Sequence, residues 1–555
     1  MNDNIVSFIP LGGIGDVTRN MYLYEYKDQI LIVDCGLGFA DETMLGVDLL
    51  LPDISYLVEA IAKTNKKIVG MVISHGHEDH MGAVPLTLPQ LPQFPIFTSP
   101  LTAALLNEKL KEFGSKDRVN SVPFDNPTRV MGDFSVTFIR VTHSVPDTSH
   151  LFIKTPIGNF YHGSDFKFDE TPWDKKITDY KKIEEVAKEG ILCLFSDCLG
   201  SERKGITPTE APLYDSFVEI LANAPGRVFF TTFSSHVARL DQVITAASKT
   251  GKKVCFVGRS LLRVKDTAIK LGYLTFPKEL EVSLEEVKRI PEKNVVFLVA
   301  GSQGQESSAM TRIINGEHQE IRLSQTDTIV FSSDTIPGNE VVVNSLFDSL
   351  GKKGIHVLYP KIHDKLHVSG HGSLDELLRL IQLTHPQYLL PIGGNFRHMA
   401  LYKNFAKQHG FNEKNIFLVE DGQGVNFSSQ KAILGKKIPV KKVFVDEITG
   451  EEVEHYVLRD RQKLSESGIV IVMTEIDATS GQLVAPVDTI IRAFPTEAKK
   501  LSLAIEKELK QTLRKNNTLV TNWVSMRKLV GDISQRVIFR LLRRRPLVLP
   551  IVIEV

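Results

Sequence analysis

The segment 73–85 reads ISHGHEDHMGAVP, and its first eight positions hold three of the chain's 16 histidines and two acidic residues. It directly follows the apolar run IVGMVI, which is typical of a buried strand. In an extended loop His75 and His77 alternate and can face one ion, while the adjacent Asp79 and His80 can face a second. Zinc accepts both imidazole nitrogen and carboxylate oxygen. The spacing H-x-H-x-D-H therefore predicts a two-metal site rather than a solvated, histidine-rich loop.

Two residues further along the chain fit the same site. His143 ends a strand-like run in VTHSVPD, and Asp165 follows another in GSDFKFD. Alone, each is more often a satisfied polar residue or a turn former. In this order after H-x-H-x-D-H they become candidate ligands, and the two oxygens of a carboxylate suit Asp165 to bridging two cations.

The composition is that of an ordinary multi-domain globular protein. The 555 residues are 42% hydrophobic and 24% charged, and Lys+Arg equals Asp+Glu at 66 each, so the formal net charge is zero. Binding to a nucleic acid would therefore depend on local basic patches rather than on a global field.

The sequence predicts a cytoplasmic location. No apolar run approaches the roughly 18 residues of a membrane span, and the N-terminal sequence lacks the basic and apolar regions of a signal peptide. The cysteines lie in or beside apolar runs, which is typical of reduced, buried thiols. They are Cys35, Cys193, Cys198 and Cys255.

The pattern of predicted elements changes near residue 227. Before it, short strands alternate with tight Gly/Asp turns. After it, apolar strands alternate with helices at about 236–248 and 261–271, which indicates a parallel α/β sheet. The strand ends read TTFSSH, VGRS, AGSQGQ and SSDTIPGN. Serine, threonine and glycine at such ends let backbone N–H and hydroxyl groups approach a phosphate.

These motifs resemble the metallo-β-lactamase superfamily, which has an early aspartate (Asp34 here, in IVDCG) followed by H-x-H-x-D-H, a histidine and an aspartate. The middle segment resembles its nucleic-acid-processing β-CASP branch, and the chain as a whole is similar to the bacterial ribonuclease J family. The matching stretches include SHGHEDHMGA, THSVPD, GSDFKFD, GSQG, HVSGH and VLRDR. These stretches are spread over nearly the whole length of the chain.

The resemblance implies an α/β fold: a metallo-β-lactamase αββα sandwich, an inserted β-CASP parallel α/β domain and a small C-terminal α/β domain. The predicted boundaries are 1–205 and 363–427 for the metallo-β-lactamase domain, 206–362 for the β-CASP domain, 428–442 for a linker and 443–555 for the C-terminal domain. That last domain is expected to assemble a homodimer or homotetramer.

The resemblance also implies roles for the metal-capable residues. His75, His77 and His143 correspond to ligands of one zinc, Asp79 and His80 to ligands of the other, and Asp165 to the bridge. Asp34 corresponds to a residue that orients a ligand histidine. Two such ions lower the pKa of bound water and provide a nucleophile at neutral pH.

Two more residues are expected to act on the reacting phosphate. Asp197 in LFSDC corresponds to the family's proton donor and His371 in HVSGH to its proton acceptor. Because a histidine near a phosphate can also stabilise developing charge, the direction of proton transfer stays open.

The substrate implied is RNA, preferably with a 5′-monophosphate. Its end is expected in a pocket of the β-CASP domain, which gives 5′-to-3′ exonuclease action, while RNA lying across the groove gives endonuclease action. Relatives commonly have Asn where this chain has His236. The pocket residues are Ser234, Ser235, His367, Val368, Ser369, Gly370 and His371.

A structural calcium site is a further implication for Gly46, Asp48 and Asp446, which lie where some relatives bind Ca²⁺. The aspartates are oxygen ligands, as Ca²⁺ requires. A turn glycine and two solvated aspartates are an equally good interpretation.

One stretch departs from the family. Relatives place a zinc-ligating His in P-x-H-G-E-x-R, whereas this chain reads PIGGNFR, with Gly393 for the His and Asn395 for the Glu. The main hypothesis is a zinc ribonuclease acting in RNA turnover and rRNA maturation, with a weakened second metal site. The alternative is a catalytically weakened RNA-binding partner of an active paralogue. A small-molecule hydrolase would leave the β-CASP-like segment without a use.

Overall fold

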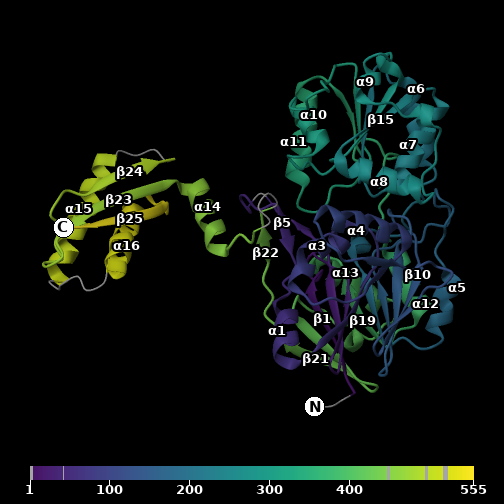
Figure 1. The fold of residues 1–555 in the computed structure, drawn as a ribbon, viewed down its shortest axis with the longest axis horizontal. Coiled ribbons are helices and arrows are strands. Elements are labelled where there is room, and N and C mark those ends of the chain that lie inside the picture. Colours follow the sequence, from purple (N-terminus) through teal and green to yellow (C-terminus); the bar gives the residue numbers. More distant parts are fainter. Residues whose placement is uncertain (1–3, 42, 447–450, 494–497, 517–522) are drawn as a thin grey trace. The chain divides into compact units, whose positions relative to one another are not determined.

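The computed structural model describes residues 4–41, 43–446, 451–493, 498–516 and 523–555. The chain divides into two compact units (Figure 1), which are described separately. The first consists of Met1–Phe39 and Leu50–Val443, and the second of Ala40–Leu49 and Phe444–Val555.

Two sheets face each other in the first unit. The larger has the strand order β21-β20-β1-β2-β3-β6-β7-β8. Its strands are β1 (Val6–Gly12), β2 (Met21–Tyr26), β3 (Gln29–Val33), β6 (Lys67–Ile73), β7 (Ile96–Thr98), β8 (Val119–Ser121), β20 (Gln423–Phe427) and β21 (Ala432–Lys437). Within the predicted linker, β21 thus pairs with β20 as part of this sheet.

The smaller sheet has the order β19-β13-β12-β11-β10-β9. Its strands are β9 (Thr128–Met131), β10 (Phe134–Arg140), β11 (Ser149–Lys154), β12 (Asn159–Gly163), β13 (Cys193–Asp197) and β19 (Tyr388–Ile392). Strand β13 runs parallel to both β12 and β19. A segment that returns almost 200 residues later, by the element bounds, therefore completes this sheet.

Apolar and aromatic side chains fill the space between the two sheets. Phe8 of β1 stacks on Phe195 of β13 with ring centroids 4.1 Å apart. The outer faces carry helices, with α4 against β7 and β8, and with α12 and α13 against β13 and β19. The helices of this part are α1 (Ser55–Thr64), α4 (Pro100–Glu112), α5 (Tyr180–Ala187), α12 (Leu374–Thr384) and α13 (Phe396–Gln408). These layers confirm the predicted αββα sandwich.

The stretch MGAVPLTLPQL, which begins at Met81, does not form one continuous helix. The structure has the short α2 (Glu78–Met81), the short α3 (Val84–Thr87) and a 3₁₀ turn at Leu88–Gln90. Pro85 lies in the first turn of α3. Because proline has no N–H to donate to the preceding turn, α2 cannot continue through it.

The inserted segment forms a separate five-stranded sheet in which every pair is parallel, with the order β15-β16-β14-β17-β18. Helices α10 and α11 lie on one face and α6 and α7 on the other (Figure 1). The strands are β14 (Val228–Thr231), β15 (Lys253–Val257), β16 (Val295–Val299), β17 (Thr328–Phe331) and β18 (His356–Leu358). The helices are α6 (Leu213–Asn223), α7 (Val237–Lys249), α8 (Arg259–Lys270), α9 (Leu284–Val287), α10 (Ala309–Asn315) and α11 (Glu340–Lys352). Helices α7 and α8 confirm the two helices predicted here.

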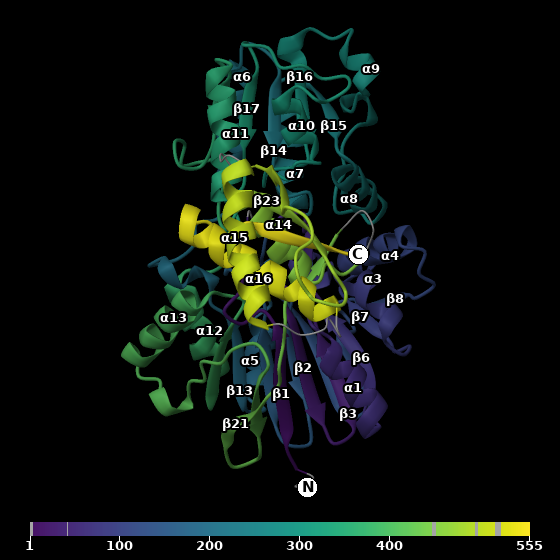
Figure 2. The same cartoon turned by 90° about the vertical axis from the view of Figure 1, so that its left-hand side faces the viewer.

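The second unit contains a three-stranded sheet in the order β24-β23-β25, with α15 and α16 packed together against it (Figure 2). Along β23 buried and half-buried residues alternate, as expected for a strand with one face in a core. Its elements are α14 (His455–Ser467), β23 (Ile469–Ile476), β24 (Asp488–Arg492), α15 (Ala498–Asn516), α16 (Trp523–Leu542) and β25 (Leu547–Glu554).

The remaining short strands are β4 (Gly38–Phe39), β5 (Leu49–Leu51) and β22 (Val443–Val445). None of the described helices combines the length and apolar character needed to cross a bilayer.

Candidate metal centre

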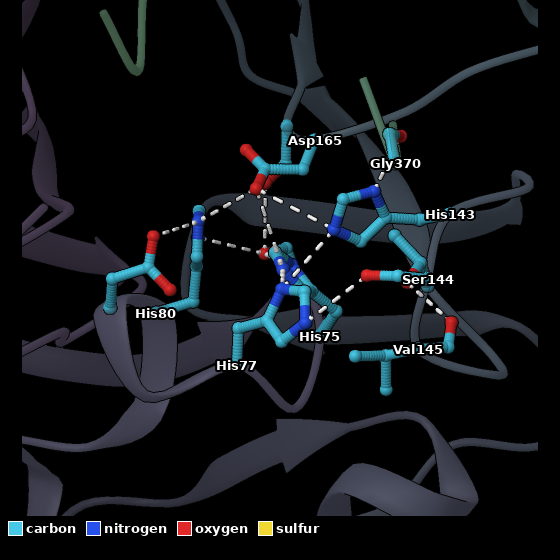
Figure 3. Close-up of polar contacts among 12 residues, drawn as sticks. His75, His77, His80, His143, Ser144, Val145, Asp165 and Gly370 are labelled. Atoms are coloured by element: carbon cyan, nitrogen blue, oxygen red, sulfur yellow. Dashed lines mark hydrogen bonds and ion pairs between the residues drawn. The ribbon is translucent and has the colours of Figure 1, made fainter. Parts of the chain in front are cut away.

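The candidate ligands emerge where strands of the two facing sheets end. His75, His77, Asp79 and His80 follow β6, while His143 follows β10 and Asp165 follows β12. Figure 3 shows the rings of His75, His77, His80 and His143 gathered around the carboxylate of Asp165.

Within the described ranges, three groups have potential ligand atoms that all lie within 4.8 Å of one another. Asp165 belongs to every group, which is the placement that a bridging carboxylate requires. The groups are His75, His77, His143 and Asp165; Asp79, His80 and Asp165; and Asp165, Asp197 and His371.

The first group fits a nitrogen-rich metal site. The Nδ1 atom of His77 lies 3.1 Å from Nε2 of His75 and 3.2 Å from Nε2 of His143. Burial lowers the pKa of His75 and His77 well below the ordinary range, and lowers that of His143 to about 3. All three rings are therefore neutral near pH 7, and neutral imidazole is the form that binds a metal.

The second group is held by Asp34. The Nδ1 atom of His80 lies 2.8 Å from Oδ2 of Asp34, so a proton on Nδ1 leaves Nε2 to face Asp165 at 3.4 Å and Asp79 at 3.5 Å. The backbone N–H of Ser74 also donates to Asp34, at 2.7 Å. This is the carboxylate–histidine arrangement that orients metal ligands.

The charges around the second group also suit a cation. Burial raises the pKa of Asp79 to about 6. Burial would lower the pKa of His80, but Asp165, Asp79 and Asp34 outweigh it and raise that pKa well above the ordinary range. A buried site this rich in carboxylates attracts positive charge, and a divalent ion supplies it.

The third group contains the two residues expected to act on the phosphate. The Nδ1 atom of His371 lies 2.7 Å from Oδ2 of Asp197, and its Nε2 lies 3.8 Å from Asp165. Burial alone would lower the pKa of His371, but the carboxylates of Asp197 and Asp165 raise it to about 9. The imidazole is therefore a cation at neutral pH in the absence of metal.

Gly393 lies at the end of β19 with φ +64°, and a Cβ atom there would lie 3.9 Å from Oδ1 of both Asp165 and Asp197. A side chain at this position would therefore point at the carboxylates. His398 does not supply the ligand that is missing at position 393, because its Nδ1 accepts a hydrogen bond from the N–H of Asn395 at 3.2 Å in the cap of α13. The second group thus keeps only its three members.

The predicted substrate residues divide by exposure. Ser234 and Ser235 are half-buried residues that follow β14, and Oγ of Ser234 lies 3.1 Å from Oγ of Ser260. The side chain of Val368 is buried, so only its backbone could meet a ligand. Gly370 supports the metal centre instead, since its carbonyl accepts from Nδ1 of His143 at 2.7 Å. The sequence motifs SHGHEDHMGA and HVSGH contain Ser74 and Gly370, but they do not indicate that these two residues support the metal centre.

The calcium prediction concerns the second unit. The carbonyl of Gly46 accepts a hydrogen bond from Nη1 of Arg461 at 2.7 Å, so positive charge is already present there. The backbone N–H of Asp48 donates to the carbonyl of Val445 at 3.1 Å. Ca²⁺ binding by Gly46, Asp48 and Asp446 stays a prediction.

The αββα sandwich and the histidine–aspartate clusters at its strand ends define a hydrolase of the metallo-β-lactamase fold. Family models agree: residues 14–231 match the metallo-beta-lactamase superfamily and 355–419 the Zn-dependent metallo-hydrolase RNA specificity domain. Residues 225–350 match the ribonuclease J beta-CASP domain and 456–555 the ribonuclease J C-terminal domain. The chain belongs to the ribonuclease J family.

Similar proteins match the chain along its length. Ribonuclease J2 of Bacillus subtilis is 34% identical over 558 residues, covering 100% of this chain and 99% of the relative. Ribonuclease J of Synechocystis is 36% identical over 98% of this chain and 86% of the relative. Ribonuclease J of Thermus thermophilus is 35% identical over 99% of this chain and 95% of the relative.

One solved structure supports the fold alone. It is a protein of unknown function from Enterococcus faecalis V583, with a TM-score of 0.53 and 16% identity. The match covers 76% of this chain and 100% of that chain.

Proposed function

We propose that the protein is a zinc-dependent ribonuclease that hydrolyses RNA phosphodiester bonds from the 5′ end and within the chain, in RNA turnover and rRNA maturation. The observation that carries the proposal is the convergence of three groups of potential ligands on the carboxylate of Asp165. The four cysteines are free and buried, which supports action in the reducing cytoplasm.

In this proposal, His75, His77 and His143 hold one metal ion, and Asp79 and His80 contribute to the other. A divalent ion bound there supplies Lewis-acid chemistry and a water of lowered pKa. The site lies at loops fixed by two rigid sheets, which suits the positioning that phosphodiester hydrolysis requires.

The chain's own contribution to the reacting phosphate comes from His371 and Asp197. Nδ1–H of His371 donates to Asp197, which leaves Nε2–H directed toward the side of Asp165. A proton on Nε2 there stabilises negative charge as it develops on a phosphate oxygen. Asp197 keeps the ring in that orientation.

The 5′-monophosphate is assigned to the pocket of Ser234, Ser235 and the segment 367–371. The serines follow a parallel strand, and Ser260 beside them is in the first turn of α8. Hydroxyls and helix N-termini beyond strand ends are favourable for phosphate groups.

The test compares a 5′-monophosphorylated RNA with the same RNA carrying a 5′-triphosphate, each with and without a chelator. The proposal expects nucleotide release from the monophosphate form, much slower release from the triphosphate, and no cleavage with chelator. Equal rates on both RNAs would refute the exonuclease part, and cleavage that persists in chelator would refute the metal assignment.

The alternative, a weakened relative that binds RNA beside an active paralogue, is favoured by Gly393. Its absent side chain leaves the second group with three members. Binding of the monophosphorylated RNA without turnover, even with added Zn²⁺, would establish this alternative.

Assembly into a homodimer or homotetramer through the second unit is supported by an exposed apolar face. Leu549, Ile551 and Ile553 of β25 are 42%, 43% and 47% exposed and alternate with Val548 and Val552, which pack in or against the core. Light scattering of the full chain and of an Ile551→Lys variant tests this: the variant should shift to a smaller species.

A further inference from the structure

The inserted segment with its five-stranded sheet is called the inserted lobe, and the two-sheet part of the first unit that carries the candidate metal centre is called the metal-bearing lobe. A buried cluster of charged side chains, called the Glu210 cluster, joins the two lobes. It consists of Lys167, Glu210, His236 and Arg239. Glu210 is only 4% exposed, and Arg239 is fully buried. Charges are buried this deeply only when they are paired and hydrogen-bonded.

Every polar group of Glu210 has a partner. Its Oε1 accepts from Nζ of Lys167 at 3.0 Å. Its Oε2 accepts from Nε2 of His236 at 3.0 Å and from Nη2 of Arg239 at 3.3 Å. Its backbone N–H donates to Asp169 at 3.1 Å, and its carbonyl accepts from Gln242 at 2.8 Å. The carboxylate therefore has one well-defined position.

The three partners of the Glu210 carboxylate each adjoin or contact a segment that carries a predicted functional residue. Lys167 is two residues after Asp165, and His236 directly follows Ser235. Arg239 donates to the carbonyl of Leu366 at 3.0 Å, directly before His367 in the chain. The cluster thus connects the loop of the bridging carboxylate to both segments of the phosphate pocket.

His236 itself does not have the chemistry of a phosphate ligand. Burial lowers its pKa to about 4, so the ring is neutral and its Nε2–H donates to Glu210. Only Nδ1 remains, an acceptor without a hydrogen-bond partner in the described part of the chain. A phosphate oxygen needs a donor, so the contribution of His236 is to hold Ser235 in place through Glu210.

We propose that Glu210 is a positioning residue that sets the distance between a bound 5′ end and the bond that is cut. This inference rests on the proposed function. Cleavage that starts from a 5′ end needs the pocket and the metal centre in fixed register, whereas cleavage within a chain needs only the metal centre. Loosening the cluster should therefore affect the first activity and spare the second.

The experiment uses the full chain with Glu210→Gln, which keeps the shape and removes the charge. The two substrates are a linear 5′-monophosphorylated RNA and a circular RNA of the same sequence, which has no 5′ end. We expect the variant to lose at least roughly tenfold in kcat/KM on the linear RNA, since a misplacement of about 1 Å can cost 10²-fold. Cleavage of the circle should change by less than about threefold, because the circle has no 5′ end to place in the pocket and sites that share no partners affect each other little.

A control variant breaks another contact between the lobes. Arg263 of α8 forms an ion pair with Glu112 of α4, whose side chain is 54% exposed. Glu112→Gln removes that pair without touching the cluster, so the ratio of linear to circular cleavage should stay at the wild-type value.

His236 provides a second route if Glu210→Gln does not fold. His236→Leu removes one donor to Glu210, and His236→Gln restores an amide donor. The ratio of linear to circular cleavage should fall in the first variant and recover in the second. Equal losses on both RNAs, or no loss on either, would overturn the inference. A wild-type protein that cleaves neither RNA would instead refute the proposed function.

Discussion

Nδ1 of His143 lies 2.7 Å from the carbonyl oxygen of Gly370, 227 positions away in sequence. The segment that returns after the inserted lobe thus fixes the orientation of a candidate metal ligand in the first part of the chain. The Nδ1–H group of His143 donates a hydrogen bond to this carbonyl, which leaves Nε2 free to bind a metal.

Gly370→Ala should therefore weaken metal binding. A Cβ atom at this position would come within 2.7 Å of the His143 ring, so the ring must move. We expect a loss of about 10–100-fold in metal affinity, as for other partners that orient ligands. Calorimetric titration with Zn²⁺ measures it. Gly351→Ala, where a Cβ meets nothing within 4 Å, is the matched control; equal affinities in the two variants would contradict the assigned role.

His77→Ala should abolish cleavage and leave the fold intact. The ring belongs to the nitrogen-rich group, while the surrounding sheets have a large core that does not depend on it. Metal content by atomic emission should fall, and circular dichroism should stay unchanged. The exposed His409→Ala serves as the control. Wild-type cleavage by His77→Ala would show that the ligand assignment is wrong.

Gly393→His should tighten the second metal site and raise the cleavage rate. A side chain there points at Asp165 and Asp197. The positive φ costs about 1–3 kcal/mol in a non-glycine residue, and a recovered ligand should still improve affinity by roughly tenfold or more. Metal titration and cleavage rates of both proteins measure this. Gly251→His, with a similar φ of +67° and open space, separates strain from ligation. If the wild type already holds two ions as tightly as the Gly393→His variant does, this expectation fails.

The stability of the fold should depend on His236 below neutral pH. Its folded pKa is about 4, below the ordinary 6.5, so the unfolded chain binds more protons between these values. The stabilisation is complete above pH 6.5 and is lost as the pH falls toward 4, by roughly 3 kcal/mol from this one group. Other buried histidines titrate as well, so the measurement is the difference in unfolding free energy between wild type and His236→Gln. That difference should shrink as the pH drops from 7 to 4.5; a constant difference would contradict the assigned protonation.

The sequence predicted the features that depend on local pattern. Runs such as KVCFV and the spacing in HGHEDH are short-range signals, and the strands and the ligand clusters formed where these signals lie. Apolar periodicity continues across Pro85, so periodicity alone does not reveal the break between α2 and α3. The contact of Glu210 with His236 could not be foreseen, since it joins a loop to a helix start through tertiary packing alone.

The pairing of β1 with β20 has a consequence for synthesis. Val6 pairs with Phe427, and β13 finds its second neighbour only at Tyr388. At about 5–20 residues per second on the ribosome, β1 waits roughly 20–85 s for its second partner, β20. The inserted lobe needs no such wait, because its strands lie within 228–358. A nascent chain should thus complete the inserted lobe first, so His371 joins the candidate metal centre only after that lobe has formed.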